Sequence, residues 1–131
     1  MASILLIEDD HDTRVTLRQN LEAEGHFVYT STNGRDGLDA LKRLDPSPSL
    51  IVIDLMMPIM GGDEFVRRIR TVPAFARIPI IAMSAHRDPA IEGVTGYLCK
   101  PFDLENLLAA IETGLQPRSP EQQQSLFVPY Y

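Results

Sequence analysis

Three acidic side chains stand directly after strand-like apolar runs, and their positions point to one shared site. Glu8 and Asp9 follow Ile4–Ile7, and Asp54 follows Leu50–Ile53. If the two runs are neighbouring strands, the three carboxylates converge in one small crevice. They then repel one another unless a cation or a proton intervenes. Proteins rarely assemble such a cluster for stability, so we interpret it as a functional site.

The chemistry that these residues support is phosphoryl transfer. Two or three carboxylates suit Mg²⁺, which keeps some of its waters and usually faces a phosphate. Ser84 and Lys100 end two further apolar runs and would add a hydroxyl and a positive charge at the same rim. A metal ion and a lysine can neutralise phosphoryl oxygens while a carboxylate attacks. The alternative, that acidic residues after strands are only helix N-caps, is the simpler interpretation of Asp10 and Asp12.

The elements that must position these residues alternate between strand and helix. Short, nearly all-apolar strands separated by helices predict an α/β doubly wound fold, with a parallel sheet covered on both faces. Ligands of such sheets bind at the carboxyl ends of the strands, where the candidate residues stand. The expected strands are Ser3–Ile7, His26–Ser31, Leu50–Ile53, Ile78–Met83 and Gly96–Leu98, and the expected helices are Thr13–Glu24, Asp36–Leu44, Asp63–Arg70 and Asp103–Gly114.

The connection between Ser84 and Lys100 is unusually short. Its fifteen residues, Ala85–Cys99, must hold a loop, any crossover helix and the last strand. Asp88-Pro89 is a fair helix start, but Gly93 follows almost at once. We therefore expect a fourth helix of about one turn, or none.

Length and composition predict one domain and argue against several functions. The chain has 131 residues, 44% of them apolar, so residues 1–115 can form one domain with its own core. Residues 116–131 are rich in Pro and Gln and then apolar, and we expect them to form a tail. No run approaches the length of a membrane span, and no basic leader precedes the first strand. A net charge of −6 with scattered basic residues argues against direct nucleic-acid binding. The single cysteine, Cys99, fits a cytoplasmic location.

Four motifs in order resemble the receiver domain of the bacterial response regulators, over roughly residues 3–115. They are Ile7-Glu8-Asp9-Asp10, the run DLMMPIMGG from Asp54, Ser84-Ala85 and Tyr97-Leu98-Cys99-Lys100-Pro101-Phe102. The resemblance implies a five-stranded, flavodoxin-like sheet in the order 2-1-3-4-5, here with a shortened or missing fourth helix. It also implies a phosphorylatable signalling switch in a two-component phosphorelay.

The same resemblance implies the phosphorylation chemistry. Asp54 would accept a phosphoryl group from a sensor histidine kinase or a histidine phosphotransfer protein. Glu8, Asp9 and Asp54 would hold Mg²⁺ together with the backbone carbonyl of Met56. Lys100 would pair with the phosphoryl group.

Further roles concern the response to phosphorylation. Ser84 would hydrogen-bond the phosphoryl group and move towards it, and Tyr97 would be the aromatic switch that turns inward when Ser84 moves. Met56 and His86 stand where the family tunes hydrolysis of the acyl phosphate. The Lys100-Pro101 peptide bond is often cis in this family. Phosphorylation adds nearly two negative charges at the rim, so loops that gain partners only in that state would shift.

Two alternatives remain open. A pseudo-receiver would be a protein-interaction module that keeps the fold without phosphorylation, and only the shortened fourth crossover supports it. A phosphatase of the haloacid-dehalogenase type also uses a nucleophilic Asp after a strand, but it requires a second Asp two residues later, where this chain has Met56. We therefore expect a phosphoacceptor that catalyses only its own phosphoryl transfer and autodephosphorylation, and not an enzyme with other substrates.

The sequence after the receiver-like region bears on how this protein would pass on its signal. No output domain follows it in the sequence, so we expect a stand-alone receiver that docks to an unknown downstream protein, relays phosphate or acts as a phosphate sink. The missing helix belongs to the surface that receivers commonly use for dimerisation. We expect the apolar end Leu126–Tyr131 to cover the exposed edge, in its own chain or in a neighbour's, which would give a homodimer through a non-standard surface.

Overall fold

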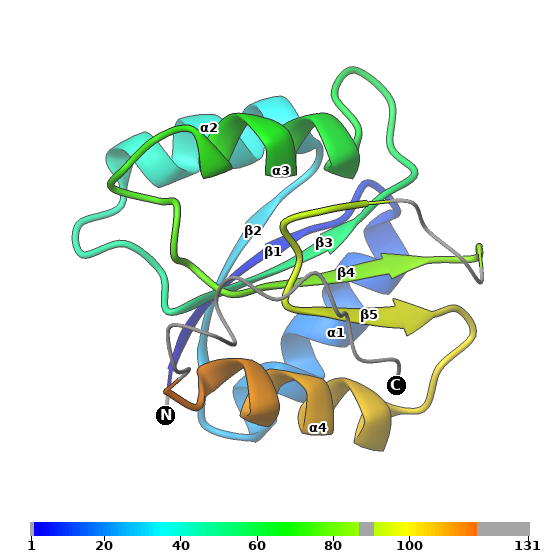
Figure 1. Cartoon of the computed structure of the whole chain (residues 1–131). Helices are drawn as coiled ribbons and strands as arrows, with labels where there is room; N and C mark the ends of the chain where they lie inside the picture. Colours follow the sequence, from blue (N-terminus) through cyan, green and yellow to red (C-terminus); the bar gives the residue numbers. More distant parts are fainter. Residues whose placement is uncertain (1, 87–90, 118–131) are drawn as a thin grey trace.

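Five parallel strands form one sheet with helices on both faces, as predicted (Figure 1). The computed structural model describes residues 2–86 and 91–117. The strands pair in the order β2-β1-β3-β4-β5, which confirms the order 2-1-3-4-5. Their bounds are β1 (Ser3–Ile7), β2 (Phe27–Ser31), β3 (Leu50–Asp54), β4 (Ile80–Ser84) and β5 (Gly96–Cys99).

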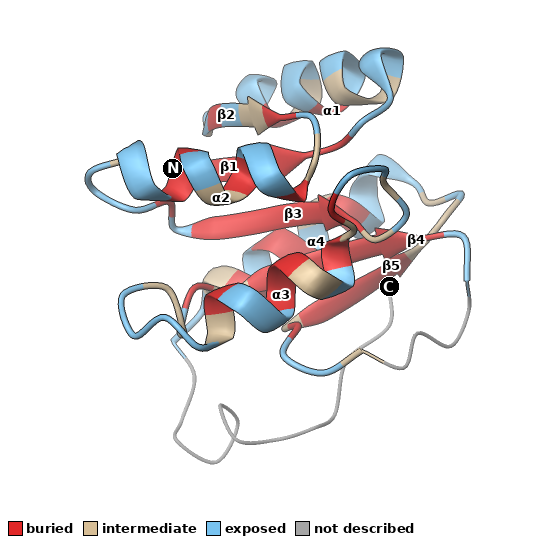
Figure 2. Cartoon of the chain, turned by 90° about the horizontal axis from the view of Figure 1, so that it is seen from above, coloured by how far each residue is buried: buried red, intermediate tan, exposed pale blue. Residues whose placement is uncertain are grey.

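Two helices cover each face of the sheet (Figure 1). The helices α1 (His11–Ala23) and α4 (Leu104–Leu115) lie on one face, and α2 (Gly34–Arg43) and α3 (Gly62–Arg70) lie on the other. Each face has its own apolar cluster, and every residue of β3 and β4 is buried between them (Figure 2). In the described part of the chain, no helix has the length and apolar character that a bilayer span requires.

Side-chain caps determine where α1 and α2 begin. Asp10 Oδ2 accepts hydrogen bonds from Thr13 N at 3.0 Å and Thr13 Oγ1 at 2.6 Å, and these bonds lower the pKa of Asp10. Asn33 Oδ1 accepts from Asp36 N at 2.9 Å, so α2 begins at Gly34 and not at the expected Asp36. Asp10 is therefore a helix cap, as the simpler interpretation of its position proposed.

The crossover between β4 and β5 contains no helix within the residues that the structure describes, in agreement with a shortened or missing fourth helix. One side chain from the end of α3 fastens this crossover. Arg70 Nε and Nη2 donate to Gly93 O at 2.8 and 2.6 Å, and Nη1 donates to Ala76 O and Ile78 O, both at 2.8 Å. A single guanidinium thus joins the crossover to the turn that precedes β4, using the several donors that arginine carries in a fixed plane.

Arg70→Met is expected to lower the free energy of unfolding by about 2 kcal/mol, because three backbone carbonyls lose a charged donor while the aliphatic stem is kept. Chemical denaturation measures this change. Arg67→Met is the matched control, because Arg67 is exposed and its ion pair with Asp63, at 3.4 Å, contributes little. Equal losses in the two variants would contradict the assigned role of Arg70.

Two expectations concern residues that the structure does not describe. The predicted tail, 116–131, lies outside the described residues from 118 onward, and so does the Leu126–Tyr131 segment that we expect to cover the exposed edge. The candidate helix start at Asp88-Pro89 also lies outside them. These expectations stay predictions.

Candidate functional site

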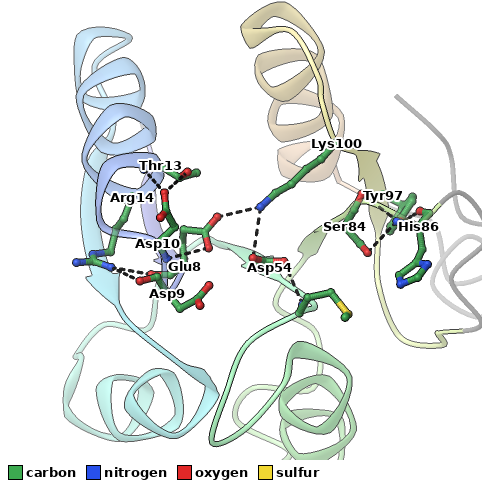
Figure 3. Close-up of polar contacts among 11 residues, drawn as sticks. Glu8, Asp9, Asp10, Thr13, Arg14, Asp54, Ser84, His86, Tyr97 and Lys100 are labelled. Carbon is green, nitrogen blue, oxygen red and sulfur yellow. Dashed lines mark hydrogen bonds and ion pairs between the residues drawn. The ribbon is translucent and has the colours of Figure 1, made fainter.

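The strand register brings the acidic residues together at the carboxyl edge of the sheet (Figure 3). Ile7 lies beside Ile53, so the next residues, Glu8 directly after β1 and Asp54 at the end of β3, lie at the same level of the sheet. One carboxylate oxygen from each of Glu8, Asp9 and Asp54 lies within 4.8 Å of the others. Parallel strands end at one edge, which is why Glu8 and Asp54, 46 positions apart in the chain, can share a site.

Lys100 bridges two of the three carboxylates (Figure 3). Its Nζ lies 3.1 Å from Glu8 Oε1 and 3.3 Å from Asp54 Oδ2. Glu8 is fully buried and Asp54 is only 5% exposed, so the ammonium neutralises charges that water cannot solvate. Burial lowers the pKa of Lys100, but its hydrogen bond to Glu8 and the charge of Asp54 outweigh burial and hold the pKa above its usual 10.5. The Lys100-Pro101 peptide is cis, in agreement with the family pattern.

Glu8 titrates near neutral pH. Burial is the largest cause that raises its pKa from 4.5 to about 7, followed by the hydrogen bond and the charge of the Asp54 carboxylate. Lys100 opposes this rise without cancelling it. The buried, crowded carboxylates therefore hold a proton more readily than isolated ones, because Lys100 offsets burial and like-charge repulsion only in part.

The donor set fits a hard divalent cation. Two buried carboxylates and the exposed Asp9 offer oxygen ligands, and exposure on one side leaves room for retained water. Asp54 Oδ1 accepts a hydrogen bond from Met56 N at 3.1 Å, which orients the carboxylate towards the cluster. The side chain of Met56 is 61% exposed beside it. Metal binding by the Met56 carbonyl stays a prediction.

The predicted switch residues form a second group beside the carboxylates. Ser84 is buried, and its Oγ accepts from His86 N at 3.1 Å. Tyr97 is fully buried, and its hydroxyl donates to the carbonyl of His86 and, at 3.5 Å, to that of Ser84. His86 itself is exposed. Figure 3 shows that Ser84 lies between Asp54 and the Tyr97–His86 pair, so it stands between the candidate site and the aromatic side chain.

The loop from β3 to α3 carries a strained residue. Ile59 has φ 71° and is 82% exposed. A β-branched side chain in this left-handed region is an outlier that costs free energy. Gly34 N donates to Met60 O at 3.0 Å, so the start of α2 fixes the loop next to the strained position.

Ile59→Asn is expected to raise the free energy of unfolding by about 1 kcal/mol, because Asn tolerates the left-handed region and little packing is lost at so exposed a site. Thermal and urea unfolding measure the gain. Ile59→Val is the control, since it keeps the branched Cβ and should leave stability unchanged. A gain in the Val variant, or none in the Asn variant, would show that the backbone is not strained there.

The sequence analysis missed Arg14, a residue of α1 that contacts the backbone of the acidic pair Glu8 and Asp9. Its Nη1 donates to the backbone carbonyls of Glu8 at 2.9 Å and Asp9 at 3.3 Å (Figure 3). The available signal was a basic residue one helical turn after Asp10, where a long side chain can reach back over the preceding loop.

Three comparisons with known proteins agree on the family. The model of the response regulator receiver domain matches residues 4–112. The chain is 37% identical to the "14.6 kDa protein in sodA1 3'region" of Leptolyngbya boryana, over 83% of this chain and 86% of that protein. It superposes on the chemotaxis response regulator CheY4 of Vibrio cholerae with a TM-score of 0.80 and 30% identity, covering 88% of this chain and 99% of that one.

Several relatives are much longer than this chain. It is 35% identical to the sensor histidine kinase TmoS of Ectopseudomonas mendocina over 82% of its own length, but spans only 11% of that protein. It spans about half the length, from 50% to 55%, of three transcriptional regulatory proteins that it matches. A family match over residues 4–112, together with the strand order and the acidic cluster, leads to one conclusion: this chain belongs to the response regulator receiver domain family.

Proposed function

We propose that this receiver domain is a phosphorylatable switch that accepts a phosphoryl group on Asp54 with the help of Mg²⁺. The observation that carries the proposal is the placement of the buried Asp54 carboxylate between Lys100 and the acidic pair Glu8 and Asp9. A carboxylate so placed can act as a nucleophile towards a phosphorus atom whose oxygens are neutralised by positive charge.

The reaction forms a bond from an Asp54 carboxylate oxygen to phosphorus and breaks the bond from phosphorus to the imidazole nitrogen of a phosphohistidine, which leaves with the bonding electron pair and is protonated. Glu8, Asp9 and Asp54 would hold Mg²⁺, which when bound would neutralise charge at the phosphoryl oxygens. Lys100 holds Asp54 before the reaction and pairs with the phosphoryl group after it.

The switch residues respond to the new charge. The Ser84 hydroxyl gains a phosphoryl acceptor, and a movement of Ser84 alters the loop that holds the Tyr97 hydroxyl through the His86 carbonyl. Met56 is exposed and its backbone N–H contacts Asp54, and His86 is exposed and its N–H contacts Ser84; these placements support a role of both residues in the rate of acyl phosphate hydrolysis. The proposed partners are a histidine kinase or histidine phosphotransfer protein and a downstream protein.

Acetyl phosphate tests the proposal without a partner. With Mg²⁺, the intact mass is expected to rise by one phosphoryl group, and with a chelator it is expected to stay constant. Borohydride reduction of the acyl phosphate followed by peptide mapping should place the modification on Asp54. A protein that binds Mg²⁺ yet gains no mass would favour the pseudo-receiver alternative, and modification of another residue would move the acceptor elsewhere.

A further inference from the structure

We propose that Arg14 is a positioning residue for the magnesium site, acting as a clamp on the backbone that carries Glu8 and Asp9. The clamp consists of the Arg14 guanidinium and the two carbonyls to which it donates. This inference rests on the proposed function, because it assigns to Arg14 the orientation of two of the carboxylates that would hold the metal.

The first observation is that β1 ends just before the clamp. Its pairing with β2 and β3 extends only to Ile7, so the Glu8 carbonyl lies beyond the last strand pair. Buried backbone carbonyls need a donor, and Glu8 is fully buried. Arg14 Nη1 provides that donor at 2.9 Å and also reaches Asp9 O at 3.3 Å. Glu8 N still donates to Ser31 O at 3.0 Å, so the guanidinium supplies a donor for the carbonyl side of Glu8, where the acidic pair begins.

The second observation is that the guanidinium is itself held in place. Arg14 Nη2 lies 3.3 Å from His11 Nδ1. Because arginine has donors only, the imidazole nitrogen must be the acceptor of this hydrogen bond. One nitrogen of the fork thus faces the carbonyls and the other faces the first turn of α1, which orients the whole group.

The third observation concerns how the two carboxylates are restrained. The Glu8 side chain is fixed by Lys100. The Asp9 side chain is exposed, and among the contacts of the described residues its carboxylate has no hydrogen bond. Its direction is set by its own backbone, so loss of the clamp should affect Asp9 most. Groups that orient metal ligands typically contribute to affinity although they never touch the metal.

The charge of Arg14 acts in the opposite sense, and this makes the proposal testable. A positive group next to a cation site repels the cation, so removing the charge alone would strengthen Mg²⁺ binding. Removing a group that positions the metal ligands would instead weaken Mg²⁺ binding. The sign of the change therefore separates positioning from simple electrostatics.

Isothermal titration with MgCl₂ at constant ionic strength tests the clamp in four proteins: the unchanged protein, Arg14→Met, Arg14→Lys and Arg18→Met. Arg14→Met is expected to bind Mg²⁺ about tenfold more weakly. Arg14→Lys, which keeps the charge but not the fork, should lie between it and the unchanged protein. Arg18→Met removes the same charge one turn along α1, where Arg18 pairs with Glu22 at 3.3 Å, and should bind as the unchanged protein does.

Unchanged or tighter Mg²⁺ binding by Arg14→Met would contradict the positioning role of Arg14 and would leave the proposed function intact. An unchanged protein that binds no Mg²⁺ would overturn both. Circular dichroism and melting of the metal-free variants distinguish a general loss of structure. If Arg14→Met does not fold, the conservative Arg14→Lys variant decides, and equal affinity of that variant and the unchanged protein would overturn the clamp.

Discussion

Asp54→Asn is expected to gain no mass with acetyl phosphate at any Mg²⁺ concentration, a complete loss of labelling. The amide is a poor nucleophile, and among the described carboxylates only Glu8 is also buried and paired with Lys100, where the proposed function assigns it to the metal and not to the phosphoryl group. The measurement is intact-mass spectrometry over a time course, with the unchanged protein labelled in parallel.

Two neighbouring acidic residues provide controls for this result. Asp10→Asn should be labelled as the unchanged protein is, because Asp10 caps α1 through Thr13 and takes no part in the cluster. Asp9→Asn removes a metal ligand but not the acceptor, so its labelling should return at higher Mg²⁺ concentration. Labelling of Asp54→Asn at the unchanged rate would place the acceptor on another residue.

Raising the pH from 5 to 8 without metal is expected to remove on the order of 2–3 kcal/mol of unfolding free energy through Glu8 alone. The pKa of Glu8 rises from 4.5 to about 7 on folding, mainly through burial and then through Asp54. The folded protein therefore binds more protons than the unfolded chain between these values. The stabilisation by this proton is complete below about 4.5 and is lost as the pH passes 7.

Urea denaturation in the presence of a chelator, at several pH values between 5 and 8, measures this loss. Glu8→Gln is the control, because it keeps the shape of the side chain and removes the titrating group, so the difference between the two proteins isolates Glu8. Saturating Mg²⁺ should restore stability at pH 8 in the unchanged protein and much less in Glu8→Gln. Equal pH dependence in the two proteins would contradict the raised pKa.

The sequence predicted a parallel sheet between helices because the strands of this protein are almost entirely apolar. Runs such as Leu50–Ile53 can be buried on both faces only in a parallel sheet between helices, and this is how β3 lies. The ends of the elements were less predictable. The strand expected from Ile78 begins at Ile80, because Pro79 has no N–H for a strand ladder. The capping by Asn33 depends on one hydrogen bond that apolar periodicity does not encode.

The candidate site was predictable where it depends on strand ends. Glu8, Asp54, Ser84 and Lys100 each follow or end a strand, so a parallel arrangement alone places them on one edge. The prediction that β1 and β3 are neighbours depended on the family resemblance, because the sequence pattern alone allows other strand orders. The spacing of Arg14 after Asp10 indicates only that its side chain can reach the loop; which carbonyls it contacts depends on how the loop leaves β1.

The guanidinium of Arg70 has a consequence for how this protein tolerates mutation. A crossover helix spreads its anchoring over many side chains, so that each can be replaced at little cost. In the described part of the crossover, Val94 packs into the core, and the side-chain hydrogen bonds from α3 come from Arg70, which contacts three carbonyls. Substitution of Arg70 therefore removes several backbone contacts at once, so a position outside the acidic cluster should tolerate mutation poorly.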